Sequence, residues 1–242
     1  MMDYINYISG ISFRFIKPQT PLVPIGWTKL RNLLNFGVLL ELNNTKIPYR
    51  ERKMKCNLRE ICYMPKMSTF AIGAMINMGV SKMPENHVFV NIGTWYGFTF
   101  LAGIINNSQK KCVGIDNFSE FGGPRNEFLK KFDKYKSRKH HFYETNYVDY
   151  FLKVHREPIG FYIYDGNHSY ENQLHGLQMA EPFFTKNSII LVDDVNYDEV
   201  RQATVNFISK SPYKYRVIFD KTTYCNYHPT FWNGVMVLQR TE

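Results

Sequence analysis

The sequence lacks any hydrophobic run that approaches the roughly 20 apolar residues needed to span a bilayer. It also lacks a basic start followed by an apolar core, so we expect no secretion signal. Cysteine is scarce, and its four residues are too scattered for a disulfide framework or a zinc ligand set: Cys56, Cys62, Cys112 and Cys225. These absences predict a reduced, cytoplasmic protein.

Internal repeats and low-complexity segments are also missing. Hydrophobic residues make up 44% of the 242 residues and aromatic residues 16%, which permits a sizeable core in one α/β domain with an extension, or in two small domains. We expect residues 1–66 to form an irregular N-terminal extension with one short helix near residues 27–40, because this segment holds five prolines and little periodicity. Such an extension could act as a lid or a subunit contact, and residues 67–242 would form the main domain.

Positive charge exceeds negative charge, giving a formal net charge of +9. Lysine and arginine crowd into residues 125–139, which two histidines follow. One interpretation is a nucleic-acid-binding patch. The other is a solvated helix that turns Phe128, Leu129 and Phe132 toward a core. We favour the helix, because no nucleic-acid-binding motif accompanies the charge.

Strand and helix patterns alternate after residue 67. The predicted strands span residues 87–92, 111–115, 141–144, 161–164, 188–192, 213–219 and 234–238. The predicted helices span residues 68–81, with Ser68 as the cap, and residues 98–106, 125–137, 148–154, 170–182 and 198–209. This alternation predicts a mostly parallel sheet with helices on both faces. Such sheets bind ligands beyond the carboxyl ends of their strands, where the strand order reverses.

A glycine turn follows the first of these strands, between Gly93 and Gly97. The dinucleotide-binding fingerprint would need a third glycine where this chain has Trp95, and an indole there argues against a pyrophosphate on the backbone. A nucleoside-type cofactor without phosphates fits better. Asp116 ends the next strand, where a carboxylate can accept hydrogen bonds from both hydroxyls of a ribose. The alternative is an ordinary strand–turn–helix.

Three aspartates and a histidine follow two further strands. Asp165 comes directly after residues 161–164, with His168 three residues later, and Asp193 and Asp194 come directly after residues 188–192. Unpaired carboxylates brought together need a compensating positive charge, and oxygen donors suit Mg²⁺, Ca²⁺ or Mn²⁺. His168 would serve as a general base near neutral pH. The structural alternatives are a helix cap at Asp194 and a hydrogen-bonded turn residue at His168.

Four motifs occur in order: residues 91–97, 114–121, 165–171 and 192–194. Together they resemble the class I S-adenosylmethionine-dependent methyltransferases, in particular the metal-dependent O-methyltransferases of sugars and small molecules that include macrolide-sugar enzymes. The resemblance covers about residues 68–240. It implies a Rossmann-like, seven-stranded, mostly parallel sheet with an antiparallel C-terminal strand.

The resemblance also implies roles for individual residues. The cofactor-binding positions would be Asn91, Gly93, Thr94, Tyr96, Gly97, Asp116 and Asn117. In that family, the glycine turn lies under the methionine part of the cofactor. The position of Asn91 is usually acidic, so this chain lacks a charge that would favour the cofactor's amino group. The family implies that Asp165, Asp193 and Asp194 hold a divalent cation such as Mg²⁺, and His168 would take the acceptor's proton.

We therefore expect methyl transfer to a hydroxyl of a small molecule, such as a sugar or a glycosylated metabolite. Two alternatives are a non-catalytic Rossmann-like protein that binds a cofactor or nucleic acid, and a nicotinamide-dependent oxidoreductase. The aromatic segment 222–232 could form a wall of the acceptor pocket or pack on the N-terminal extension. A homo-oligomer is compatible with the extension.

Overall fold

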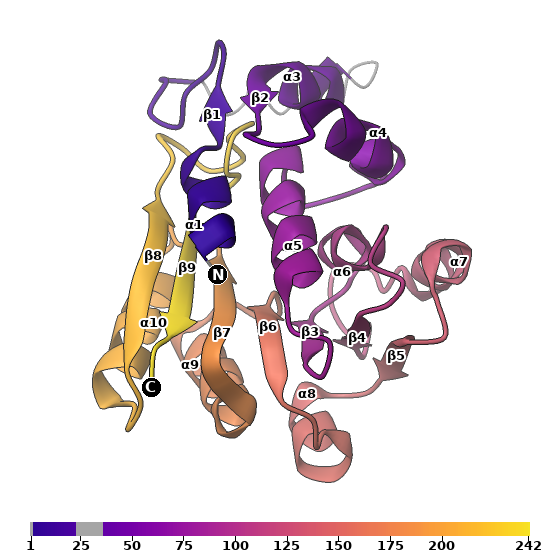
Figure 1. Ribbon diagram of the computed structural model, residues 1–242, viewed down its shortest axis with the longest axis vertical. Helices are drawn as coiled ribbons and strands as arrows, with labels where there is room; N and C mark the ends of the chain where they lie inside the picture. Colours follow the sequence, from indigo (N-terminus) through magenta and orange to yellow (C-terminus); the bar gives the residue numbers. More distant parts are fainter. Residues whose placement is uncertain (1, 23–35) are drawn as a thin grey trace.

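A computed structural model describes residues 2–22 and 36–242, and a central seven-stranded sheet organises them (Figure 1). Its strands are β3 (Val88–Ile92), β4 (Lys111–Asp116), β5 (His140–Glu144), β6 (Ile159–Tyr164), β7 (Phe184–Asp193), β8 (Tyr215–Lys221) and β9 (Val235–Arg240). Their order across the sheet is β5-β4-β3-β6-β7-β9-β8. Strand β9 runs antiparallel to both of its neighbours, and the other pairs are parallel. The predicted fold class is confirmed.

The chain reverses its direction of travel across the sheet between β3 and β6. From β3 it proceeds outward through β4 to β5, and it then returns to lay β6 against the other side of β3. Asn91 therefore pairs with Gly114 on one side and with Ile163 on the other. Loops that leave the two central strands diverge here, which creates a crevice at their carboxyl ends.

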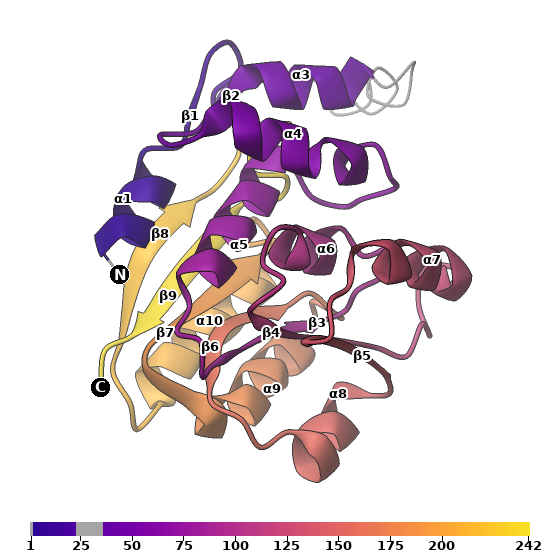
Figure 2. The same ribbon diagram turned by 45° about the vertical axis from the view of Figure 1, so that its right-hand side comes forward.

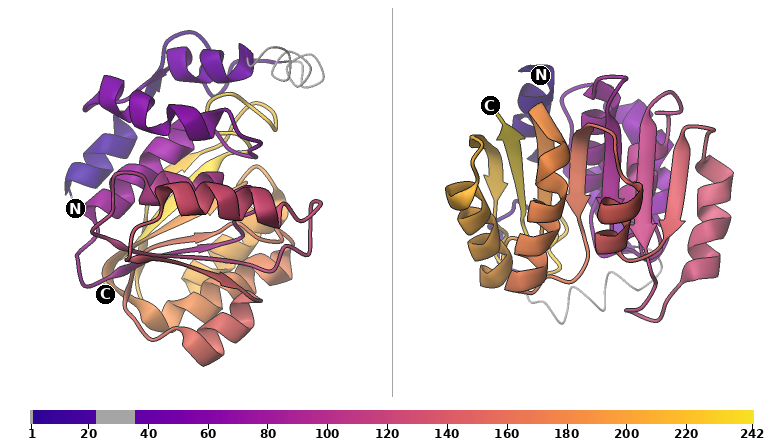
Figure 3. Two further views of the ribbon diagram at one scale, coloured as in Figure 1. Left: turned by 90° about the vertical axis from the view of Figure 1, so that its right-hand side faces the viewer. Right: turned by 90° about the horizontal axis from the view of Figure 1, so that it is seen from below.

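Helices cover both faces of the sheet (Figures 2 and 3). One face carries α5 (Phe70–Lys82), α6 (Phe98–Ile104) and α7 (Arg125–Tyr135). The other carries α8 (Tyr147–Asp149), a π-helical turn at Tyr150–Val154, α9 (Tyr170–Ala180) with a 3-10 turn at Glu181–Phe183, and α10 (Asp198–Lys210). Because side chains alternate along a strand, β3 sends Phe89 into the first core and Val88 and Val90 into the second.

The N-terminal extension contains more helix than the sequence predicts. It holds α1 (Met2–Ser9), α3 (Phe36–Asn44), α4 (Glu51–Cys62) and a small antiparallel pair of β1 (Ser12–Phe13) and β2 (Thr45–Lys46). The signal for α4 was present, since its buried Met54, Leu58 and Ile61 recur at helical spacing. Of the helix expected at residues 27–40, positions 27–35 lie outside the described residues.

The extension packs on the sheet domain at two places. Helix α1 lies along α5, and the ring of Tyr4 meets that of Phe161 edge to face at 6.1 Å. Near β1, Phe13 meets Phe231 in the same way at 5.1 Å, and Tyr224 donates its backbone N–H to the carbonyl of Pro18. The aromatic segment 222–232 thus packs on the extension, as one of the two interpretations predicted.

The basic run forms α7, which buries Phe128 and Phe132 as the solvated-helix interpretation predicts. Its Lys134 pairs with Glu60 of α4 at 2.5 Å. The four cysteines are free thiols. Within residues 2–22 and 36–242, no helix has the length and apolar character needed to cross a membrane.

Close packing between α5 and β6 yields a prediction about stability. A methyl group at Gly79 would collide with the ring of Phe161, which is fully buried. Although alanine is the better helix former by about 1 kcal/mol, we expect Gly79→Ala to lower the free energy of unfolding by about 1–3 kcal/mol through overpacking. Chemical denaturation measures this change. Ser81→Ala, on the exposed side of the same helix, is the control, and a Gly79→Ala variant as stable as the parent protein would contradict the packing argument.

Candidate functional site

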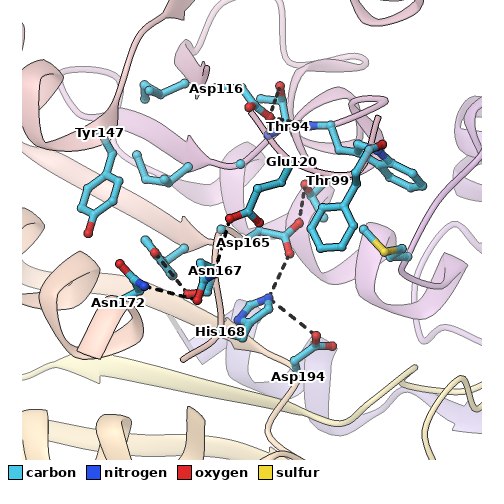
Figure 4. Close-up of a pocket in the computed structure, with 18 of the residues that line it drawn as sticks. Thr94, Thr99, Asp116, Glu120, Tyr147, Asp165, Asn167, His168, Asn172 and Asp194 are labelled. Carbon is cyan, nitrogen blue, oxygen red and sulfur yellow. Dashed lines mark hydrogen bonds and ion pairs between the residues drawn. The ribbon is translucent and has the colours of Figure 1, made fainter. Parts of the chain in front are cut away.

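A cavity of about 520 Å³ lies at the carboxyl ends of β3, β4, β6 and β7, where the strand order reverses. Its lining combines acidic, amide and aromatic side chains with a single histidine, His168. Figure 4 shows that the loops after these strands point their polar groups toward one another. A concave site with convergent polar groups at this position is the usual ligand site of the fold.

The glycine turn forms one side of the cavity. Gly93 and Gly97 have φ values of 77° and 101°, in the region that disfavours other residues. A side chain on Gly93 would collide with the backbone of Asp165, so the turn after β3 runs directly against the end of β6. Between the glycines, Trp95 also has positive φ, at 46°, and donates its indole N–H to the carbonyl of Phe121. The glycine turn expected after the first strand of the sheet domain is therefore present, and the backbone angles at both of these positions favour glycine.

Asp116 holds the glycine turn in place. Its Oδ2 accepts hydrogen bonds from the backbone N–H groups of Thr94 and Trp95, each at 2.7 Å. Its Oδ1 accepts the N–H of Phe118, also at 2.7 Å. Charge-assisted bonds from three backbone groups fix both the carboxylate and the turn. Asp116 and its neighbour Asn117 line the cavity, so the predicted ribose position has this second, structural role.

The other predicted cofactor residues divide into two groups. Gly93 and Thr94 line the cavity, whereas Asn91, Tyr96 and Gly97 lie behind its surface. Asn91 is fully buried and donates its amide to the carbonyl of Gly93, but its Oδ1 accepts no hydrogen bond. Tyr96 packs edge to face on Trp95 at 4.8 Å. Gly97 is the N-cap of α6, and its missing side chain leaves room for Phe128.

His168 lies between two carboxylates at the edge of the cavity (Figure 4). Its Nε2 is 3.7 Å from Oδ1 of Asp165 and 3.6 Å from Oδ2 of Asp194, and its Nδ1 is 3.4 Å from Oε1 of Gln173. Asp194 has a φ of 61°, an uncommon value for aspartate that aims its side chain at this point. The predicted convergence of Asp165, Asp194 and His168 is therefore present.

Asp193 lies beneath this group and does not line the cavity. Its side chain is buried, and its Oδ1 accepts the N–H of Asp194 at 3.0 Å. The alternative that Asp194 caps the following helix is not realised by its side chain, because only its backbone carbonyl accepts the N–H of Tyr197.

The electrostatics of the group favour a positive charge. Burial, and then repulsion from Asp194 and Asp165, raises the pKa of Asp193 far above its ordinary value. Burial also raises the pKa of Asp194 to about 6, although the charge of His168 opposes this. Burial lowers the pKa of His168, but the nearby carboxylates of Asp165 and Asp194 outweigh that effect and raise it overall. A nearby cation would stabilise the charged form of each of these carboxylates.

The three aspartates offer the oxygen atoms that a hard cation prefers, but their side chains are not arranged as a set of metal ligands. Within residues 2–22 and 36–242, no three His, Cys, Asp or Glu side chains stand together as metal ligands. The imidazole of His168 lies between Asp165 and Asp194, and Asp193 is buried and does not line the cavity. Still, Oδ1 of Asp194 is buried without a hydrogen-bond partner, and all three acids offer the oxygen ligands that Mg²⁺ prefers.

Several residues of the cavity were not predicted from the sequence. Thr99 donates its hydroxyl to Oδ2 of Asp165 at 3.2 Å, and Glu120 reaches in from the loop after β4. The residues that precede α5 form another wall, which includes Lys66 and Ser68. Position offered a signal for Thr99, which follows the glycine turn by two residues. No comparable signal identified the others, since their placement depends on loop conformation.

The hydrogen bonds of Asp116 predict the effect of an isosteric change. In Asp116→Asn, one acceptor oxygen becomes an amide that meets a backbone N–H, so we expect a loss of about 1–3 kcal/mol in unfolding free energy. Thermal and urea unfolding measure it. Asp149→Asn, at an exposed aspartate paired with Lys153, should change stability by less than about 0.5 kcal/mol. Equal stabilities for the two variants would contradict the proposed role in the turn.

Comparisons with known proteins agree with this geometry. Residues 90–195 match a family model described as a methyltransferase domain. No curated protein matches the sequence. The fold is similar to that of an O-methyltransferase from Bacillus cereus solved with S-adenosylhomocysteine, with a TM-score of 0.57, 12% identity, and coverage of 90% of this chain and 97% of that one. It is also similar to the O-methyltransferase TomG from Streptomyces achromogenes, solved with S-adenosylmethionine, with a TM-score of 0.54, 12% identity, and coverage of 92% and 100%.

At these identities the solved structures show similarity of fold alone. The family model matches the segment that contains the glycine turn, Asp116, Asp165 and Asp193. Residues 90–195 are thus similar to a methyltransferase domain, and the chain shares its fold with methyltransferases solved with S-adenosylmethionine or S-adenosylhomocysteine.

Proposed function

We propose that the protein is an O-methyltransferase that moves a methyl group from S-adenosylmethionine to a hydroxyl of a small acceptor, such as a sugar or a glycosylated metabolite. In this proposal His168 is the general base, and Asp165, Asp193 and Asp194 hold a divalent cation, Mg²⁺ being the expected one. The observation that carries the proposal is the position of His168 between two carboxylates, at the edge of the cavity that the glycine turn borders.

The cofactor would occupy the side of the cavity formed by the glycine turn and the end of β4. Gly93 and Thr94 expose backbone to the ligand there, while Asp116 and Asn117 are placed for the ribose hydroxyls. A carboxylate oxygen accepts more than one hydrogen bond, so Asp116 can hold the turn and a ribose together. Tyr96 and Gly97 support the turn from behind. Asn91 supports the same turn from behind, because its side-chain amide donates a hydrogen bond to the carbonyl of Gly93.

His168 would serve as base because its Nε2 points between the acids and its pKa is raised. When bound, the cofactor supplies a methyl group activated by a sulfonium. Nε2 of His168 would take the proton of the acceptor hydroxyl as that oxygen replaces the cofactor's sulfur on the methyl carbon. Asp165 and Asp194 then stabilise the imidazolium that results. Holding the acceptor oxygen in line with the methyl carbon would lower much of the remaining activation barrier.

A divalent cation would add a second positive charge at the same acids. It would lower the pKa of the acceptor hydroxyl and fix its direction. Because His168 now occupies the space between Asp165 and Asp194, the cation requires this ring to turn toward the cavity. The unpartnered Oδ1 of Asp194 and the raised pKa of Asp193 support such a site, since both acids gain from a cation.

The acceptor side of the cavity supports a polyhydroxylated ligand. Tyr197, Tyr227 and Trp232 form an aromatic wall next to Asp194, and the rings of Tyr227 and Trp232 meet edge to face at 5.2 Å. Asn167 and Asn233 add amide donors and acceptors. Aromatic faces pack on the C–H surface of a sugar ring while amides bind its hydroxyls, which is why we retain a sugar as the proposed acceptor class.

The central experiment combines binding with methyl transfer. Calorimetry should show binding of S-adenosylhomocysteine and none of NAD. With methyl-labelled S-adenosylmethionine and a panel of sugars, glycosides and phenols, label should reach a hydroxyl in the presence of Mg²⁺ and fail to do so in EDTA. Asp165→Ala and Asp193→Ala should abolish this metal-dependent transfer. Full activity in EDTA would remove the cation from the proposal. Binding of NAD alone would favour an oxidoreductase, and cofactor binding without transfer to any acceptor would favour a binding protein.

The role of His168 predicts a selective loss of rate. We expect His168→Gln to lower kcat by roughly 10²–10⁴-fold while the affinity for S-adenosylhomocysteine stays within about twofold. Because the pKa of His168 is raised, its imidazole in the metal-free protein should titrate with a midpoint above about 6.5, which NMR of the histidine ring measures. His87→Gln, at a histidine bonded to Thr185 near the opposite ends of the strands, is the control. A His168→Gln rate within a few-fold of the parent would exclude it as the base.

A further inference from the structure

One buried polar residue contacts the proposed base. Gln173 belongs to α9 and is fully buried, and its Oε1 is 3.4 Å from Nδ1 of His168. Its Nε2 is also buried and finds no hydrogen-bond partner among the described residues. A buried amide donor without a partner costs free energy, so an apolar residue would be more stable here unless the rest of the amide has a use. The contact with His168 indicates such a use.

The start of α9 explains how the two residues meet. Ser169 is the N-cap of the helix, and its hydroxyl accepts the backbone N–H of Asn172. His168 therefore directly precedes the cap, and Gln173 is the fourth residue of the helix. These are the two positions of the hydrophobic staple, where apolar side chains usually pack on each other and fix the direction in which the chain enters a helix. Helical side chains tilt toward the N-terminus, which brings Gln173 back toward the cap.

The pair at these positions is polar in this chain. A methionine at residue 173 would supply the apolar side chain of a staple and leave no amide unsatisfied. What the glutamine adds is a hydrogen-bond acceptor directed at one ring nitrogen of His168. The reason for a glutamine therefore lies in the chemistry of that ring.

The position of the ring hydrogen decides whether a neutral histidine can act as a base. One nitrogen of neutral imidazole carries a hydrogen and the other a lone pair. Nε2 of His168 faces Asp165 and Asp194 at 3.7 and 3.6 Å, which is longer than a hydrogen bond (Figure 4). Nδ1 instead lies within hydrogen-bond distance of Gln173. An acceptor opposite Nδ1 keeps the hydrogen there and leaves the lone pair on Nε2.

We propose that Gln173 is a positioning residue that selects the tautomer of His168. Its Oε1 accepts the Nδ1–H, so the neutral ring presents the lone pair of Nε2 to the acceptor hydroxyl. The inference rests on His168 being the base of the proposed function. The carboxylates of Asp165 and Asp194 by themselves favour a hydrogen on Nε2, where the ring could take no proton, and the bond to Gln173 opposes them.

The first experiment observes the tautomer directly. The full-length protein is prepared with isotope-labelled histidine, and NMR of the ring nitrogens is recorded without added cation, at a pH where more base no longer changes the signals of His168. His168→Gln identifies those signals by their loss. We expect the parent protein to carry the ring hydrogen on Nδ1. In Gln173→Met the acceptor is gone, so we expect the form with its hydrogen on Nε2 to become the major one.

The second experiment measures the rate at one fixed Mg²⁺ concentration. A tilt of the ring toward the cavity moves Nε2, at its far end, more than Nδ1, so the bond to Gln173 can persist when a cation is bound. We expect Gln173→Met to lower kcat by roughly 10–10²-fold while the affinity for S-adenosylhomocysteine stays within about twofold. In a protein that already carries His168→Gln, the same substitution should cost nothing further, because Gln173 acts only through that ring.

Controls separate this role from a structural one. Gln178→Met, at an exposed glutamine of the same helix, should change neither the tautomer nor kcat. Urea unfolding should find Gln173→Met at least as stable as the parent protein, because it leaves no buried amide unsatisfied. If that variant nevertheless fails to fold, Gln173→Leu removes the same acceptor, and the tautomer of the parent protein tests the inference without any variant at position 173.

Two outcomes would overturn the inference. One is a parent protein whose neutral His168 carries its hydrogen on Nε2. The other is a Gln173→Met protein that keeps the tautomer of the parent. A His168→Gln rate within a few-fold of the parent would instead show that the proposed base itself is wrong, whichever tautomer the ring adopts.

Discussion

The contact between the turn after β3 and the end of β6 is the constraint on which the rest of the site depends. Gly93 brings backbone against the backbone of Asp165, an approach that any side chain would prevent. This contact lies where the chain reverses its direction across the sheet, and it places the glycine turn beside the acids that follow β6 and β7. Asp116 then fixes the turn from β4 through three backbone hydrogen bonds.

Charge in this molecule is divided between its surface and its cavity. The chain carries a net charge of +9, yet the charged residues that line the cavity are mainly acidic. Burial, and then repulsion between neighbouring carboxylates, raises the pKa of Asp193 and of Asp194. Such an arrangement favours ligands that carry positive charge. Three positive charges could stabilise these carboxylates: the sulfonium of the proposed cofactor, an imidazolium at His168 and a divalent cation. In the proposed reaction, these charges would lie at neighbouring positions.

The N-terminal extension is bound to the sheet domain through polar as well as apolar contacts. Glu41 caps α5 and pairs with Lys66, and the segment around Pro18 hydrogen-bonds to the aromatic loop that carries Tyr227 and Trp232. Both contacts end at residues of the cavity wall or directly beside them. We therefore propose that the N-terminal extension serves as a lid over the ligands.

The sequence by itself determined the order of strands and helices along the chain, because that order follows from local periodicity. It also determined the position of the glycine turn and of the acids at the strand ends, because these depend on single residues in a local pattern. It predicted that His168 would join Asp165 and Asp194, since strand ends in a parallel sheet share an edge. The tertiary structure alone decided that Asp116 is bound by the turn, that Asp193 lies beneath the cavity, and that Glu41 rather than Ser68 caps α5. Those contacts join segments distant in sequence, and no local pattern encodes which buried donor meets which acceptor.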